Sequence, residues 1–269
     1  MSAISTSPEI LQFESLQPFC DILTFSTTRN GGCSSGAYGS FNLSYFSGDA
    51  PENVTQNRMK LCDLLQINSR QLFVPCQTHG TDIAVLDEPF LQLDTEQQQA
   101  QLYGKDALIT DCRQIAIAVT TADCVPIILY AADKRVGAAI HAGWRGTCDK
   151  IVQRTIDRMI DRYSCNPQLI HAVIAPSISQ ESFEVGEDVY EAFLQNGFDM
   201  TAIARKNPGS GKYHIDLWEA NRMVLVEAGV PGSQIEVAGI CTRQNGSRFF
   251  SARAEGINSG RMLTGIVLR

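Results

Sequence analysis

The sequence predicts an α+β fold in which mixed β-sheets pack together and helices flank them. The chain has 269 residues, of which 44% are hydrophobic and 19% are charged. This ordinary globular composition excludes a collagenous, coiled-coil or disordered chain, and the length suits one large domain or two small ones. Segments with the pattern of strands come in runs, and only part of the chain alternates strand and helix. That order favours α+β over a doubly wound fold.

Eight segments have the pattern of strands. The most apolar window runs from Ile115 to Ala132, and Asp123 and Pro126 interrupt it. We therefore expect a pair of buried strands there rather than a membrane span. In chain order, strands are expected at residues 73–75, 83–86, 115–120, 126–130, 136–140, 170–175, 235–238 and 248–251.

Four segments have the pattern of helices. The segment 147–163 has an apolar stripe of Ile151, Ile156, Met159 and Ile160. Helices are expected at residues 54–65, 147–163, 187–194 and 217–228. The polar segment 94–101 (DTEQQQAQ) is expected to be an exposed loop. No G-x-G-x-x-G or Walker A motif follows any strand, so a nucleotide cofactor bound through these motifs is not indicated.

Charge and cysteine content exclude several classes of function. The formal net charge is -7 and the pI is about 5.1, with no basic run, which argues against binding nucleic acid or an anionic membrane. The first twenty residues contain no Lys or Arg and no apolar run suited to export. The nine cysteines are scattered and odd in number, which fits reduced thiols. We therefore expect a cytoplasmic protein.

Two histidines and one cysteine stand at the ends of predicted strands. His79 follows the short strand that ends at Pro75, His141 follows the strand 136–140, and Cys124 interrupts the apolar window. Two imidazoles and one thiolate form a ligand set for zinc, and three protein ligands with an open fourth position are typical of catalytic zinc. The alternative is that Cys124 is a core residue and each histidine a polar residue with structural hydrogen bonds.

The other two histidines are expected to be structural. His171 begins the strand 170–175, and His214 precedes the helix 217–228.

Two patches are candidates for binding anions. Arg29 stands beside the paired glycines Gly31 and Gly32, whose amides can form an anion-binding concavity. The segment after Gly146 begins a predicted helix, whose first amides attract phosphate. Arg145 and Arg253 can add bidentate contacts. The alternative is that the glycines form turns and the arginines are solvated.

The order of several motifs resembles one protein family. The motifs are TTRNGG, SFNLS, CQTHGT, DALIT, TTADCVPIIL, HAGWRGT, IAPSIS, FEVGEDV, HIDLWEAN and FFSARAEGINSGRM. They are similar to those of the YfiH-type laccase-domain family, also called polyphenol oxidase, purine nucleoside phosphorylase or peptidoglycan editing factor. The resemblance runs from about Thr27 to Met262, so a single domain over residues 1–269 is expected.

The resemblance implies packed mixed sheets without the cupredoxin barrels of true laccases. It implies that His79, Cys124 and His141 hold zinc. It also implies that Arg29 takes part in catalysis, and that Asn42, Gln77 and Arg145 line the same cleft. Members are associated with phosphorolysis of adenosine, inosine, guanosine and methylthioadenosine, and with deamination of adenosine.

Residue chemistry separates some of these activities. A multicopper oxidase needs a histidine-rich trinuclear cluster, which four histidines cannot supply, although a single adventitious copper is an alternative to zinc. A thiolate bound to zinc is a poor nucleophile, so a metal site and a cysteine hydrolase at Cys124 exclude each other. The metal site is favoured because two histidine motifs accompany the cysteine. Asp123 is the candidate general acid or base, with the alternative that it points away from the site.

The hypothesis that follows is a zinc-dependent purine nucleoside phosphorylase with adenosine deaminase activity. Its partners are small molecules, a purine nucleoside and phosphate. Arg29, Arg145 and the helix start after Gly146 are expected to hold phosphate. Two alternatives stay open: a zinc hydrolase that edits muramyl-peptide cell-wall precursors, and a laccase-like oxidase.

Overall fold

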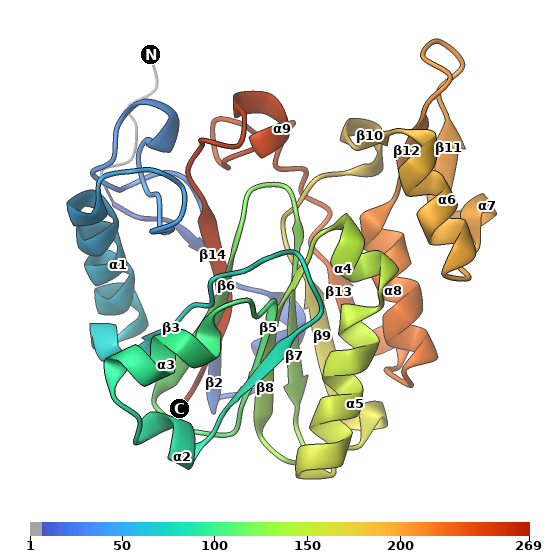
Figure 1. Cartoon of the computed structure of the whole chain (residues 1–269). Coiled ribbons are helices and arrows are strands. Elements are labelled where there is room, and N and C mark those ends of the chain that lie inside the picture. Colours follow the sequence, from blue (N-terminus) through green and yellow to red (C-terminus); the bar gives the residue numbers. More distant parts are fainter. Residues whose placement is uncertain (1–6) are drawn as a thin grey trace.

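Two large mixed β-sheets pack face to face, with a small third sheet at the periphery, in a computed structural model that describes residues 7–269 (Figure 1). This architecture confirms the predicted α+β class. The six-stranded sheet has the order β13-β9-β7-β8-β5-β4, the five-stranded sheet β1-β2-β14-β6-β3 and the small sheet β10-β12-β11. The strands are β1 (Ile10–Leu11), β2 (Ile22–Thr27), β3 (Leu72–Phe73), β4 (Ile83–Leu86), β5 (Ala107–Thr110), β6 (Ile115–Thr121), β7 (Val125–Ala131), β8 (Val136–Ala142), β9 (Ile170–Ile174), β10 (Glu184–Val185), β11 (Ala204–Lys206), β12 (Tyr213–Ile215), β13 (Ile235–Val237) and β14 (Met262–Leu268).

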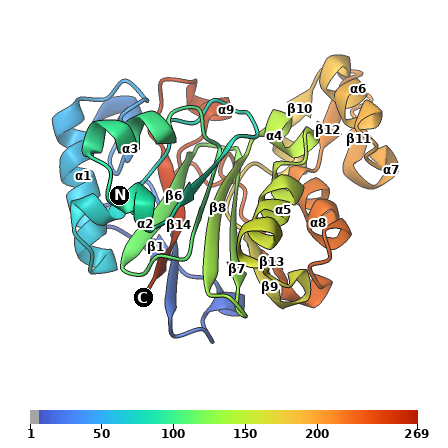
Figure 2. The ribbon, with the colours of Figure 1, turned by 60° about the horizontal axis from the view of Figure 1, so that its bottom comes forward.

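Helices cover the outer faces of both large sheets. Helix α1 packs on the five-stranded sheet, and α4, α5 and α8 lie against the six-stranded sheet (Figure 2). The α-helices are α1 (Pro51–Leu65), α2 (Glu88–Leu91), α3 (Thr95–Leu102), α4 (Trp144–Cys148), α5 (Ile151–Tyr163), α6 (Glu187–Gln195), α7 (Met200–Ile203), α8 (Leu217–Glu227) and α9 (Ala252–Glu255). Within residues 7–269, no helix has the length and apolar character needed to cross a membrane.

The central strands are apolar throughout because both of their faces are buried. In β7, Ile127 and Leu129 pack toward the helices, whereas Ile128 and Tyr130 pack between the two sheets. Successive side chains of a strand point to opposite faces, so a strand with a helix layer on one side and a sheet on the other reads as a continuous apolar run. This explains why the apolar window is the clearest sequence signal.

Seven of the eight predicted strands are present, with ends that agree to within three residues. The prediction of a strand at 248–251 is wrong, because this segment consists of turns and the N-cap of α9. The prediction of a loop at 94–101 is also wrong. That segment forms α3, which begins with a capping box in which Asp94 and Gln97 bond each other's backbone amides.

Three of the four predicted helices are present with similar ends, and the fourth is divided. Instead of one helix over 147–163, α4 ends at Cys148 and α5 begins at Ile151. Between them Lys150 has a left-handed conformation with φ of 56°. Helix α5 still presents the predicted stripe of Ile151, Ile156 and Met159 to the core.

Candidate metal centre

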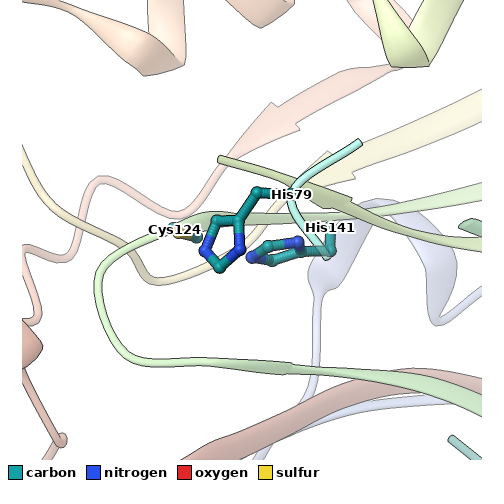
Figure 3. Close-up of side chains that lie close together, drawn as sticks. All are labelled: His79, Cys124 and His141. Atoms are coloured by element: carbon teal, nitrogen blue, oxygen red, sulfur yellow. The ribbon is translucent and has the colours of Figure 1, made fainter. Parts of the chain in front are cut away.

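The structure brings His79, Cys124 and His141 together. Their ligand atoms all lie within 4.8 Å of one another. The two imidazole rings pack edge to face, with ring centroids 4.8 Å apart, and Cys124 lies beside them (Figure 3). Within residues 7–269 this is the one group of at least three His, Cys, Asp or Glu side chains arranged to hold a metal ion.

Strand register places these side chains at one end of the six-stranded sheet. In the antiparallel pair β7–β8, Pro126 lies opposite His141, so Cys124 directly precedes the strand that pairs with the end of β8. On the other side of β8, the carbonyl of Asp106 accepts a hydrogen bond of 2.7 Å from the amide of His141. His79 comes from the loop between β3 and β4. Residues far apart in sequence therefore meet at a rigid position.

The buried carboxylate of Asp106 organises both histidines. It accepts a hydrogen bond of 2.7 Å from Nδ1 of His141. It also accepts hydrogen bonds from the backbone amides of Thr78, His79 and Gly80 at 3.2, 3.0 and 2.8 Å. This wrapping of the loop accompanies the left-handed conformation of His79, whose φ is 60°. Because Nδ1 of His141 is occupied, Nε2 is its free ligand atom.

The electrostatics of the cluster favour a thiolate. Burial by itself would raise the pKa of Cys124, but the charges and hydrogen bonds of His141 and His79 lower that pKa to about 6. Burial disfavours protonated His141, yet Cys124 and Asp106 raise the pKa of His141 to about 9. Burial also opposes ionisation of Asp106, but its bond to His141 and the backbone amides hold its pKa below the usual value. A thiolate is the form that binds metal.

We therefore expect Cys124 of the metal-free protein to titrate near pH 6 rather than near pH 9. Its lowered pKa adds stability that is lost as the pH falls through about 6, and the raised pKa of His141 adds stability that is lost above about 9. The rate of alkylation by iodoacetamide, followed by peptide mass spectrometry, measures the midpoint. Buried Cys165, whose pKa burial raises to about 12, is the internal control. A midpoint near 9 for Cys124 would contradict this assignment.

The space around the three donors fits a metal ion. Gly143 follows β8, and a Cβ atom at this position would lie 3.1 Å from His79 Cδ2 and 3.3 Å from Cys124 Sγ. A larger side chain would therefore press on two of the ligands. A soft thiolate with two imidazoles suits zinc or copper.

A cavity of about 310 Å³ opens beside Cys124. Its walls are apolar and aromatic, with few polar groups, as is typical of pockets for small molecules. The lining residues are Ala122, Asp123, Cys124, Trp144, Ile178, Phe183, Leu217, Ala252 and Arg253.

Asp123 lines this pocket, but its carboxylate is already engaged. It accepts hydrogen bonds from the hydroxyls of Thr242 and Ser251 at 2.6 and 3.0 Å, and from the amide of Arg253 at 2.7 Å. These bonds join the β6–β7 turn to Thr242 and to the start of α9. This geometry favours a structural role over the predicted acid–base role.

Arg29 and Asn42 lie outside the lining of this pocket. The guanidinium of Arg29 donates to the carbonyls of Gly39 and Gly246 and forms an ion pair of 2.6 Å with Glu255. The Asn42 side chain is fully buried, and its Oδ1 accepts a hydrogen bond from the amide of Arg261. In the structure, both residues tie chain segments together.

Gln77 and Arg145 are also outside the lining. The side-chain amide of Gln77 pairs with the backbone of Thr120, donating to its carbonyl at 2.9 Å and accepting from its amide at 2.7 Å. Arg145 is exposed, and its guanidinium stacks on the ring of Trp144, 4.2 Å from the centroid. Of the four predicted binding residues, Arg145 is the one whose side-chain polar group has no hydrogen-bond or ion-pair partner among residues 7–269.

The two predicted anion-binding backbones are built differently from the expectation. Gly31 and Gly32 pack against backbone, since a Cβ atom there would lie within 2.5 Å of Pro8 and Ser40. Gly146 lies inside α4, and the amide that follows it already donates to the carbonyl of Gly143 at 2.8 Å. The expected helix start after Gly146 is therefore wrong, because α4 begins at Trp144.

The remaining histidines have structural contacts outside the cluster. His171 packs edge-on against Phe19, with centroids 4.7 Å apart. His214 donates from Nδ1 to the carbonyl of Gln180 at 2.9 Å and faces Glu184.

Sequence reasoning missed the roles of Asp106 and Arg261. Asp106 begins the DALIT motif, and a charged residue directly before a buried strand is the signal that marks it. The guanidinium of Arg261 donates to three nearby carbonyls. Burial lowers its pKa, and the negative charges of Cys124 and Asp123 oppose that effect.

Comparison with known proteins identifies the family. A family model described as multi-copper polyphenol oxidoreductase laccase matches residues 23–269. The chain belongs to this family. The resemblance inferred from the motifs is thus confirmed.

Relatives in the family cover nearly the whole chain. A protein of Bacteroides thetaiotaomicron named purine nucleoside phosphorylase is 46% identical over 270 residues, which cover 100% of this chain and 99% of that protein. Adenosine deaminase RL5 from an unknown prokaryotic organism is 45% identical, with 90% and 92% covered. The crystal structure of hypothetical protein YfiH of Bacillus licheniformis covers 100% of both chains with a TM-score of 0.87 and 30% identity.

Proposed function

We propose that this protein is a zinc-dependent purine nucleoside phosphorylase that also deaminates adenosine. Its proposed substrates are adenosine, inosine, guanosine and methylthioadenosine. Its proposed location is the cytoplasm. The observation that carries the proposal is the His79–Cys124–His141 cluster beside an apolar pocket that Cys124 lines. The names of the relatives, purine nucleoside phosphorylase and adenosine deaminase, support the substrate class.

The pocket suits a flat aromatic base. Trp144 and Phe183 contribute aromatic surface to its walls, and Leu217 adds apolar surface. A purine ring in this pocket would lie beside Cys124. When bound, zinc supplies a Lewis acid that polarises a substrate atom or lowers the pKa of a water molecule.

Of Arg29 and Arg145, Arg145 is the better placed for phosphate. Its guanidinium is exposed beside the pocket wall and stacks on Trp144, so it can receive an anion without first giving up an ion pair. Arg29 would have to release Glu255 to act in the same way. The binding roles of Arg29, Asn42 and Gln77 therefore stay predictions.

Product analysis tests the proposal. Purified, zinc-loaded protein is incubated with adenosine, with and without phosphate, and the products are separated by chromatography. Adenine and ribose 1-phosphate that form only with phosphate support phosphorolysis, and inosine in both reactions supports deamination. The absence of every purine product would overturn the proposal.

A further inference from the structure

A second cavity, of about 320 Å³, lies on the α1 side of the molecule. It is lined by Tyr45, Thr55, Arg58, Met59, Cys62, Ser69 and Leu72. None of these residues lines the pocket beside Cys124. In Figure 1, α1 stands at the opposite side of the sheets from α4 and α8. The cavity is thus separate from the metal centre.

Arg58 brings a positive charge to this cavity without a counter-ion. The residue is half-buried, and within residues 7–269 no carboxylate forms an ion pair with it. Its Nε donates to the carbonyl of Leu43 at 2.9 Å, and its guanidinium lies 4.4 Å from the centre of the Tyr45 ring. These contacts fix the side chain and leave its two terminal nitrogens for another partner. Buried charges are normally paired, because desolvation is costly.

The tyrosine ring against which the guanidinium packs is also fixed. The hydroxyl of Thr55 donates to the carbonyl of Pro51 at 2.8 Å, so the phenol of Tyr45, 3.0 Å away, must donate to Thr55. The ring of Tyr45 is thereby held in place, although 42% of the residue is exposed. Met59, also exposed, lines the same cavity. The cavity therefore presents apolar surface around a single guanidinium.

We propose that this cavity binds a small organic anion. Its carboxylate or phosphate pairs with the terminal nitrogens of Arg58, and its apolar body packs on Tyr45, Met59 and Leu72. Carboxylate and phosphate share the chemistry that a guanidinium recognises. The volume is at the lower end of the range for ligand pockets, about 300–1,000 Å³, which limits the body to a compact group such as one aromatic ring.

The environment of Arg58 is consistent with an anionic partner. Burial lowers the pKa of Arg58 to about 10, and the groups that act in the opposite direction are Tyr45 and Cys62. Burial raises the pKa of the Cys62 thiol, so Cys62 carries no negative charge at neutral pH. The guanidinium is still charged at neutral pH, and a bound anion would supply the missing negative charge.

Titration with benzoate and phenyl phosphate, followed by NMR, tests this site, with neutral benzyl alcohol as the size-matched probe. We expect the favoured anion to bind at least about tenfold more tightly than benzyl alcohol, and Arg58→Met to lose about tenfold or more in affinity. Arg70→Met removes the same charge from an exposed position beside Ser69 and is expected to retain binding. The same titration of the Cys124→Ala protein separates the two sites. Anion binding at the metal centre would be lost in this variant, whereas anion binding at the cavity beside α1 is expected to remain.

The anion that binds more tightly identifies the preferred head group, carboxylate or phosphate. Met59→Trp places a larger side chain in the wall of the cavity and leaves Arg58 unchanged. We expect it to weaken anion binding, and it serves as the test if Arg58→Met does not fold. Equal affinity of the wild-type protein for benzyl alcohol and for both anions would overturn the proposal. Unchanged anion binding in Arg58→Met, or in Met59→Trp if that variant alone folds, would also overturn it.

Discussion

Replacing Cys124 by alanine is expected to abolish metal binding and to lower turnover by about a thousandfold or more. The thiolate is one of three donors, and its charge is the only negative one among them. Two imidazoles alone hold zinc weakly, because catalytic zinc sites use three protein ligands. Loss of a Lewis acid removes several kcal/mol of transition-state stabilisation, and each ~1.4 kcal/mol corresponds to a factor of ten in rate.

Metal content by mass spectrometry and turnover of adenosine measure this effect. Cys76→Ala is the matched control, since Cys76 lies in the same loop as His79 but outside the cluster. The control is expected to keep both its metal and its activity. If Cys124→Ala bound one metal per chain, or retained turnover without metal, the assignment of Cys124 as a ligand would fail.

The sequence predicted the three clustered side chains because each follows or precedes a strongly apolar strand. Such strands are identifiable, and their ends project side chains from a rigid sheet. The role of Asp106 was not predictable in this way. Its bond to His141 depends on the pairing of β5 with β8, and the two residues are 35 positions apart. Only strand register reveals that contact.

Missed elements have local causes. Strand β14 lies between β2 and β6, but Thr264 and Gly265 weaken its apolar pattern. The glycine is needed because a Cβ atom there would lie 2.3 Å from the carbonyl oxygen of Ile117. The sequence of helix α3 has no helical pattern because Leu102 is its only buried residue. A helix without an apolar face gives no periodic signal, although its capping residues were present.

The family resemblance implies that Asn42 and Gln77 line a shared cleft, yet the contacts of both side chains in the structure are internal. Asn42 holds the segment before β14, and Gln77 extends the edge of β6. Side chains that fix loops near a site recur in motifs just as ligands do. Motif membership alone therefore does not separate the two roles.

Asp106→Asn is expected to lower metal affinity by about 10- to 100-fold, the usual cost of losing a carboxylate that orients a ligating histidine. The structure gives a specific reason. Oδ1 of Asp106 accepts from His79 N and His141 Nδ1, whereas Oδ2 accepts from the amides of Thr78 and Gly80. In either orientation, the NH₂ group of asparagine faces at least two groups that donate in the native protein.

If the NH₂ group replaces Oδ1, it favours the tautomer of His141 that carries its proton on Nε2, the atom needed for the metal. If it replaces Oδ2, the backbone amides of Thr78 and Gly80 lose their acceptor and the His79 loop is released. Each unsatisfied buried donor costs about 1–3 kcal/mol, so a fall in melting temperature of several degrees is also expected. Competition with a chelator and thermal unfolding measure the two effects.

Asp82→Asn is the matched control, because Asp82 is an exposed carboxylate in the same loop with a single ion pair of 3.7 Å to Lys105. The lowered pKa of Asp106 also predicts the sign of the pH effect. Its contribution to stability is complete above the ordinary carboxyl pKa and is lost as the pH falls through the lowered value. The difference in stability between wild-type and Asp106→Asn protein should therefore shrink in acid. Wild-type affinity and stability in Asp106→Asn would show that this carboxylate does not position the ligands.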